Sequence, residues 1–206
     1  MPRPRVLAPW LVLFLAPACL LAEDPDPMPI RFGVQITGAS PRQDFADISR
    51  KAGAGFGFFL ESDQGDGWSC RSRVDYLAFG SSTVKDSVAS QTLLPERAQK
   101  ATSNFFSIGA EVRYHVKVFP KLVLLGGIFG GRMEFESTGP TGAVDANGTP
   151  IPGTFSIKDR TSFKLGYAGG LGFAIIPDLT LTVRYATTNL DGITLGTLEG
   201  GLDYRF

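Results

Sequence analysis

The sequence is poor in the side chains that carry most enzyme chemistry. It has one histidine and two cysteines among 206 residues. A metal centre or an activated nucleophile needs several such groups at fixed spacings, and no such spacing is visible. Lysine and arginine together number 20, as do aspartate and glutamate, so no excess of charge suggests a polyanionic partner such as nucleic acid. The sequence therefore predicts no catalytic residues, no metal site, no cofactor and no nucleic-acid partner.

Long apolar runs are also absent beyond the first 22 residues. There, Arg3 and Arg5 precede the apolar stretch WLVLFL, and small residues follow it up to Ala22. This order of parts predicts a secretory signal peptide over residues 1–22, cleaved after Ala22 or Ala18. A membrane anchor is disfavoured because the run is too short to cross about 30 Å of hydrocarbon. A lipoprotein cut before Cys19 is the lesser alternative.

Removal of residues 1–22 changes the charge and the cysteine count. It leaves 18 basic and 20 acidic side chains, a formal charge of −2, with Cys70 as the remaining cysteine. A lone cysteine forms no internal disulfide, so the fold must be stabilised in another way. Residues 23–29 are predicted to be a short Pro-rich lead-in, and residues 30–206 a single domain of substantial size.

Alternation of apolar and polar residues dominates the rest of the chain. The 25 glycines and 16 phenylalanines already favour β-structure. Period-two alternation recurs in eight segments, at residues 30–37, 54–61, 68–76, 106–115, 123–135, 163–173, 179–185 and 193–206. Short connections alternate with long ones at 38–52, 80–104 and 137–162, except that the last connection is short. The pattern predicts an all-β fold, an eight-stranded antiparallel up-and-down transmembrane β-barrel with short periplasmic turns and long extracellular loops.

The face that points inward has to be decided separately, because a soluble barrel of the lipocalin type shows the same periodicity. Here the polar face interleaves charges with glycines such as Gly57, Gly166 and Gly170. Glycine gives no advantage on a solvated exterior, where side chains have room. In the narrow interior of an eight-stranded barrel, glycine makes space for the charged side chains. The polar face is therefore predicted to point inward and the aromatic-rich face to meet lipid. The predicted barrel-interior charges are Arg31, Glu61, Arg71, Arg73, Glu111, Arg113, Arg184, Glu199 and Asp203.

These interior charges must be paired or hydrated, because an isolated buried ion is costly. If the strands pair as their turns suggest, a count of residues places Arg73 opposite Glu111. The same count places Glu61 diagonal to Arg71, Arg184 diagonal to Glu199, and Asp203 diagonal to Arg31. One interpretation is that the charges are purely structural and fill the interior as ion pairs and waters. The other is functional, with the charges lining a narrow polar pathway.

The final segment carries a more specific pattern. Leu198, Gly200, Leu202, Tyr204 and Phe206 alternate with charged residues or glycine up to the aromatic end of the printed sequence. With the signal peptide, this resembles the small eight-stranded outer-membrane barrels of the OmpA, OmpX and OmpW type. The resemblance implies that Leu198, Leu202, Tyr204 and Phe206 form the signal read by the outer-membrane barrel assembly machinery. It also implies residence in the bacterial outer membrane, with membrane lipid and lipopolysaccharide as surroundings.

The resemblance implies a non-catalytic structural or surface-interaction role, with a narrow channel for small or hydrophobic molecules as the alternative. Lipid A deacylases of this fold carry a His-x-Ser pattern, but here His115 is followed by Val116 and Lys117. No enzyme activity is therefore expected. A soluble periplasmic barrel that binds an apolar ligand is the remaining hypothesis.

The long loops hold the remaining candidates for external contacts. Residues 41–51 are predicted to form one or two helical turns with Phe45 and Ile48 on a shared face. This segment would lie either on the lipid surface or across the barrel mouth. Residues 92–104 are predicted to be similar, and an external ligand could bind through the loops.

Overall fold

A computed structural model describes residues 30–143, 145–149, 151–190 and 192–206. The predicted signal peptide and lead-in, residues 1–29, lie outside these described residues. The chain folds mainly into strands, with two short helices, α2 (Phe45–Ile48) and α3 (Val88–Leu93). The strands are β1 (Ile30–Gln43), β2 (Gly53–Gly65), β3 (Trp68–Thr83), β4 (Lys100–His115), β5 (Leu122–Pro140), β6 (Thr154–Arg160), β7 (Lys164–Ile176), β8 (Leu179–Leu190) and β9 (Ile193–Arg205).

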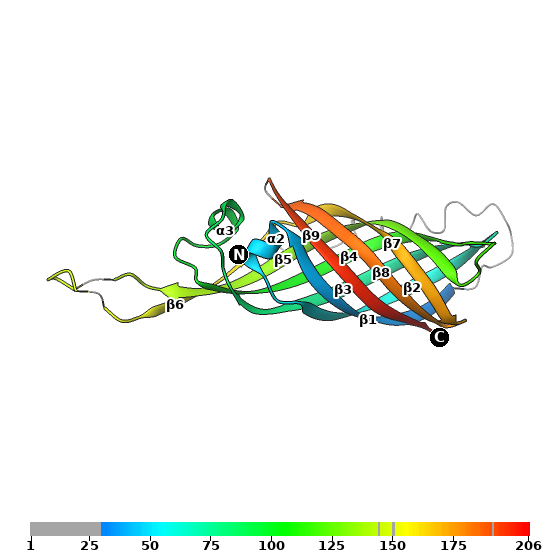
Figure 1. Ribbon diagram of the computed structural model, residues 1–206, viewed down its shortest axis with the longest axis horizontal. Helices are drawn as coiled ribbons and strands as arrows, with labels where there is room; N and C mark the ends of the chain where they lie inside the picture. Colours follow the sequence, from blue (N-terminus) through cyan, green and yellow to red (C-terminus); the bar gives the residue numbers. More distant parts are fainter. Residues whose placement is uncertain (1–29, 144, 150, 191) are drawn as a thin grey trace, which may run out of the picture.

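Eight of these strands close into an antiparallel barrel (Figure 1). The order around the ring is β4-β3-β2-β1-β9-β8-β7-β5, and a pairing of β4 with β5 closes it. β1 and β9 pair from Gly33↔Arg205 to Gln43↔Leu195, so the first and last strands are neighbours. The predicted eight-stranded up-and-down barrel is confirmed, and each predicted strand segment corresponds to one strand of the ring.

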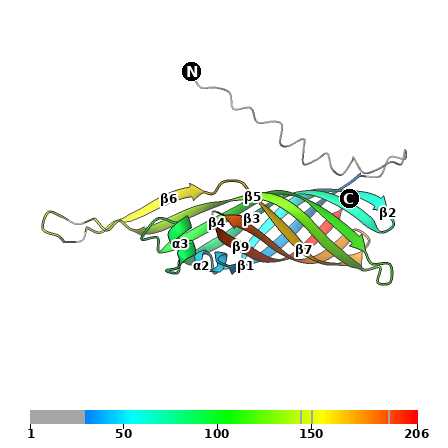
Figure 2. The same ribbon diagram turned by 90° about the horizontal axis from the view of Figure 1, so that it is seen from above.

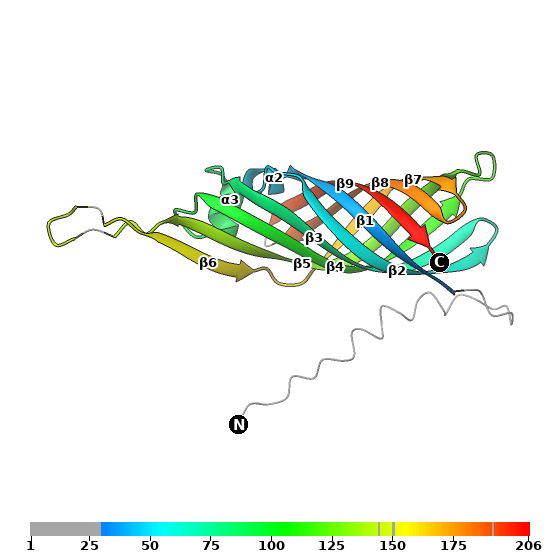
Figure 3. The same ribbon diagram turned by 90° about the horizontal axis from the view of Figure 1, so that it is seen from below.

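The two ends of the barrel differ (Figures 1 and 3). Tight turns and the C-terminus lie at one end, which we call the turn end, whereas α2, α3 and the β5–β6 hairpin lie at the other, the loop end. Two residues, Asp66 and Gly67, join β2 to β3, with φ angles of 52° and 87°. Glycine suits this left-handed position because it has no Cβ. Neither α2 nor α3 is long and apolar enough to cross a membrane.

The loop end contains two features that the sequence analysis did not predict. β5 runs for 19 residues, well beyond the roughly 9–11 that cross a bilayer, and its projecting part pairs with β6 from Glu134↔Arg160 to Pro140↔Thr154. This hairpin extends past the barrel (Figure 2). The helix expected in residues 92–104 lies earlier, at α3, because Ser87 and Ser90 form a capping box there.

Alternation along the strands separates an apolar outer surface from a polar interior. Ile36, Leu165 and Tyr167 on the outside are 62%, 69% and 67% exposed, whereas the Arg71 side chain inside is almost fully buried. A water-soluble barrel would show the opposite arrangement. The prediction that the polar face points inward is therefore correct, and the exposed belt is of the kind that lipid covers.

Candidate functional site

The half of the barrel interior nearer the turn end contains what we call the lower ion-pair layer: Glu61, Arg71, Arg113, Asp203 and Arg205. Arg71 donates from Nη2 to Glu61 Oε2 at 2.7 Å and from Nη1 to Asp203 Oδ2 at 2.5 Å. Arg113 Nη1 lies 3.3 Å from the same Glu61 oxygen, and Arg205 Nη1 lies 3.1 Å from Glu61 Oε1. One carboxylate thus receives hydrogen bonds from three guanidinium groups on three different strands.

The middle of the barrel contains a second set, the upper ion-pair layer: Arg73, Asp75, Glu111, Arg184 and Glu199. Arg73 donates from Nε to Asp75 Oδ2 at 2.6 Å and from Nη1 to Glu111 Oε2 at 3.3 Å. Arg184 pairs closely with Glu199 through Nε. Its contacts with Asp75 and Glu111 are longer, at 4.0 and 3.8 Å.

The two layers balance each other in charge. The lower layer has three guanidinium groups and two carboxylates, and the upper layer has two guanidinium groups and three carboxylates. Arg113 Nε, 3.6 Å from Glu111 Oε1, connects them. Because buried charges are costly unless paired, this balance makes a filled polar interior tolerable.

A buried aromatic ring completes the lower layer. The guanidinium carbon of Arg71 lies 3.6 Å from the centre of the Phe59 ring, a cation–π arrangement. A Cβ at position 33 would fall 2.2 Å from the same ring, so only glycine leaves room for Phe59. Sequence reasoning missed Phe59, which lies on the predicted polar face of its strand and carries no polar signal.

The structure places eight of the nine predicted interior charges within these layers. The exception is Arg31, which is exposed at the turn end. Two further members were not singled out from the sequence, although both alternate with chosen residues. They are Asp75, two positions after Arg73, and Arg205, two positions after Asp203.

The strand register corrects the predicted partners. Arg71, not Arg73, is opposite Glu111, and Arg73 reaches Glu111 diagonally. Glu61 and Arg71 are directly opposite, as are Arg184 and Glu199. Asp203 pairs with Arg71 and Arg113 instead of Arg31. For Glu61 and Arg71 the cause is an irregularity between Asp63 and Gly65, which shifts a count made from the β2–β3 turn by one residue.

The half of the interior nearer the loop end is mostly apolar, although Ser103 and Ser137 are also buried there. We call its apolar residues the apolar plug; its buried members include Phe45, Ile48, Leu77, Phe79, Phe105, Phe129, Met133 and Phe135. Phe105 and Phe129 meet edge-to-face at 5.9 Å between ring centres. These two aromatic rings border the upper ion-pair layer on the side of the loop end.

The helix α2 closes the plug at the barrel mouth. Phe45 and Ile48 are fully buried, and Phe45 packs edge-to-face on Phe79 at 4.9 Å. The Asp44 carboxylate accepts the Thr194 N–H at 2.9 Å. Of the two positions that the sequence analysis left open, the structure therefore shows the one across the barrel mouth.

A second contact region ties α2 to the loop after β3. Lys85 Nζ lies 2.8 Å from Asp47 Oδ1, and the Lys85 N–H donates to the Asp47 carbonyl at 3.0 Å. Ser82 Oγ donates to the Ile48 carbonyl at 3.0 Å. These bonds hold the buried face of α2 against the plug.

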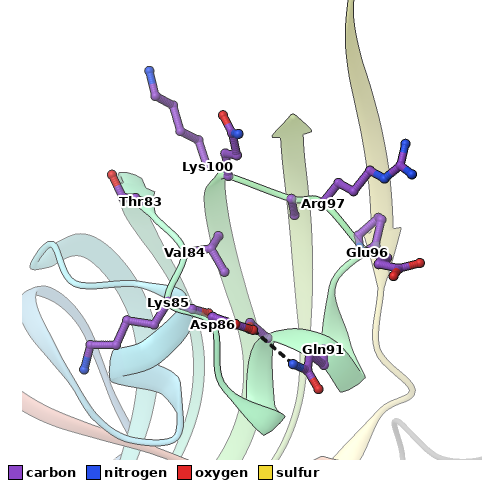
Figure 4. Close-up of a pocket in the computed structure, with 12 residues that line it drawn as sticks. Thr83, Val84, Lys85, Asp86, Gln91, Glu96, Arg97 and Lys100 are labelled. Atoms are coloured by element: carbon purple, nitrogen blue, oxygen red, sulfur yellow. Dashed lines mark hydrogen bonds between the residues drawn. The ribbon is translucent and has the colours of Figure 1, made fainter. Parts of the chain in front are cut away.

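The loop that contains α3 forms a hollow of about 830 Å³ at the loop end (Figure 4). Thr83, Gln91 and Gln99 supply polar groups, and none of the described residues that line it is aromatic. Lys85, Arg97 and Lys100 extend outward from its rim in Figure 4. The hollow suits a hydrophilic partner better than an apolar one.

At the opposite end, a polar opening of about 350 Å³ leads into the lower layer. It is lined by Arg31, Glu61, His115 and Arg205, among others. In the described ranges no cluster of His, Cys, Asp or Glu has the arrangement of a metal site. His115 lies at this turn end.

The outer face of β9 carries the residues predicted to form the assembly signal. Leu198, Leu202, Tyr204 and Phe206 are exposed on the outer surface. Phe206 stacks on Phe32 of β1 at 5.8 Å and meets Tyr204 edge-to-face at 5.1 Å. The Phe206 N–H also donates to the Phe32 carbonyl at 2.8 Å.

Comparison with known proteins gives one family match. Residues 8–206 match a family model described as the outer membrane protein beta-barrel domain. No curated protein sequence matches the chain.

Solved structures include several similar barrels. Ail, the attachment invasion locus protein of Yersinia pestis, is 16% identical with a TM-score of 0.51, covering 86% of this chain and 97% of Ail. The same values hold for Ail in complex with the heparin analogue sucrose octasulfate. Neisserial surface protein A is 15% identical with a TM-score of 0.48, covering 86% and 97% of the two chains. At such identities the likeness to Ail concerns the fold alone.

Proposed function

The chain belongs to the outer membrane protein β-barrel domain family and is a bacterial outer-membrane protein, and from this premise we propose that it is a non-catalytic barrel with a structural or surface-interaction role. The observation that carries the proposal is the filled interior. Ten charged groups bind one another in two layers, and the apolar plug lies above them. We expect such an interior to hold the ends of the strands in place and to leave no route for a solute.

A narrow channel is the alternative function. The polar opening at the turn end favours it, because water can enter there as far as the lower ion-pair layer. The apolar plug argues against it, because Phe45, Phe79 and Phe129 are buried together in the interior on the side of the loop end. The two functions differ in whether ions cross.

We expect no conductance from the folded protein in a planar lipid bilayer. Purified barrel that migrates faster on SDS gels unboiled than boiled would be added in potassium chloride solution, and current recorded at both polarities. The boiled, unfolded sample is the control for detergent artefacts. Discrete, reproducible current steps from the folded sample alone would refute the closed barrel and favour the channel.

The surface-interaction role would belong to the loop end. The β5–β6 hairpin and the hollow beside α3 project there, where an external ligand has access. Among the described strands β6 pairs only with β5, so its other edge is available. We propose membrane lipid and lipopolysaccharide around the apolar belt that includes Ile36, Leu165 and Tyr167.

We also propose that Leu198, Leu202, Tyr204 and Phe206 are read by the barrel assembly machinery. Phe206→Ala removes the ring that stacks on Phe32, and we expect a several-fold loss of folded protein in the outer-membrane fraction. Heat-modifiable mobility on SDS gels measures it. Phe173→Ala is the matched control, since Phe173 is also an exposed outer aromatic. Equal folded amounts for Phe206→Ala and the unaltered chain would remove Phe206 from the signal.

A further inference from the structure

A small cavity lies within the upper ion-pair layer. Its volume is about 20 Å³. All five residues of the layer line it, together with the plug residues Phe105 and Phe129. It is thus polar on one side and apolar on the side towards the plug.

The contacts across this cavity are of two kinds. Arg73 with Asp75, and Arg184 with Glu199, are close pairs within hydrogen-bond distance. Arg184 also approaches the two carboxylates that Arg73 bonds, but these contacts are longer, at 4.0 Å to Asp75 and 3.8 Å to Glu111. Polar groups at that separation do not hydrogen-bond directly, and they are typically bridged by water.

One donor of the layer also lacks a partner. Among the described residues, Arg73 Nη2 is buried with no hydrogen-bond acceptor, although the Nε and Nη1 atoms of the same guanidinium group are bonded. The Arg73 side chain is only 7% exposed. A buried charged donor without an acceptor is costly, so an acceptor is expected beside it.

We propose that the cavity holds one ordered water molecule, which accepts a hydrogen bond from Arg73 Nη2 and donates to a carboxylate of the upper layer. The volume suffices for a single water, which needs about 10–15 Å³ of this kind of space. Two guanidinium groups disfavour a cation in the same space, and three carboxylates disfavour an anion. A neutral molecule that both donates and accepts fits these walls.

A high-resolution crystal structure of the full barrel in detergent tests the site directly. We expect a spherical density peak about 2.6–3.2 Å from Arg73 Nη2 and from one oxygen of Asp75, Glu111 or Glu199. An empty cavity at that resolution would overturn the proposal. So would an anomalous signal from a bound ion, or a peak out of reach of Arg73 Nη2.

A substitution that fills the cavity gives a second test, in which the direction of the change in the unfolding midpoint decides. Ala186 lines the cavity, so Ala186→Val would displace the water and leave Arg73 Nη2 unpaired. We expect a lower urea midpoint of unfolding in phospholipid vesicles. In an empty cavity the added methyl groups would instead raise the midpoint. Ala54→Val, on the exposed outer face of β2, is the matched control and should not lower it.

Overpacking could also lower the midpoint, and a double-mutant cycle separates the two causes. In an Arg73→Met/Asp75→Leu background the Nη2 donor that the water would satisfy is gone, so Ala186→Val should lower the midpoint less. An equal loss in both backgrounds would mean that steric crowding, not water, explains the result, and it would overturn the proposal.

Discussion

Arg71→Met is expected to destabilise the barrel more than any other single change of an interior charge. Arg71 is the most deeply buried cation of the lower layer and holds both Glu61 and Asp203. Methionine keeps much of the volume but leaves two buried carboxylates short of a partner. Breaking a buried pair in this way costs about 3–5 kcal/mol. Urea unfolding in vesicles, followed by the fluorescence of Trp68, measures the loss.

Arg132→Met is the matched control for that experiment. Arg132 pairs with Glu134 at 3.4 Å, but both side chains are more than 40% exposed. An exposed pair contributes only about 0–1 kcal/mol, so the midpoint should hardly move. Similar losses for Arg71→Met and Arg132→Met would show that the lower layer does not stabilise the fold through its buried charges.

Phe129→Ala is expected to lower the stability of the barrel by about as much as Arg71→Met, because it disrupts the apolar plug. Phe129 lies between the upper ion-pair layer and the rest of the plug, and its ring occupies the space that a Cβ at Gly166 would need, 2.4 Å away. Removing the ring leaves a cavity that the surrounding strands cannot close. Phenylalanine-to-alanine changes in packed interiors cost about 3–5 kcal/mol. The same vesicle-based urea titration would detect the loss.

Phe173→Ala separates this packing effect from a general loss of aromatic surface. Phe173 is 49% exposed on the outer face of β7, where lipid can fill the space that the ring leaves. Its loss should therefore be clearly smaller than that of Phe129→Ala. If the two variants unfolded at the same urea concentration, the plug would not be a tightly packed unit.

The strands and their inward face could be predicted from the sequence because both depend on a period of two. Successive side chains of a strand point to opposite faces, so Ile36 of β1 and Arg71 of β3 can each be assigned to the apolar or the polar face of its own strand without knowing which residue lies opposite. The choice between a membrane barrel and a water-soluble barrel followed from the glycines that alternate with charges, because a narrow interior needs residues without bulky side chains. Gly57 illustrates this, since a Cβ there would lie 2.2 Å from Asp75 Oδ1.

The ion-pair partners and the loop end could not be predicted in the same way. A partner depends on register, and one irregular residue near Gly65 moves Glu61 from a diagonal to a direct position opposite Arg71. Phe59 and Phe129 also lie in the interior, but the sequence analysis identified the inner face by its charges, so these two apolar residues were not singled out. β6 is short and surrounded by turn-forming residues, so its pairing with β5 depends on the projecting length of β5 and not on a local pattern.

The ten interior charges are not distributed evenly along the chain. β9 supplies Glu199, Asp203 and Arg205. Without it, the other strands would enclose four guanidinium groups and three carboxylates, and Arg184 would lack its close partner Glu199. A barrel that lacks only its last strand therefore has one uncompensated positive charge in surroundings of low dielectric constant. Folding of this protein should accordingly be cooperative through its last strand, with no stable seven-stranded intermediate.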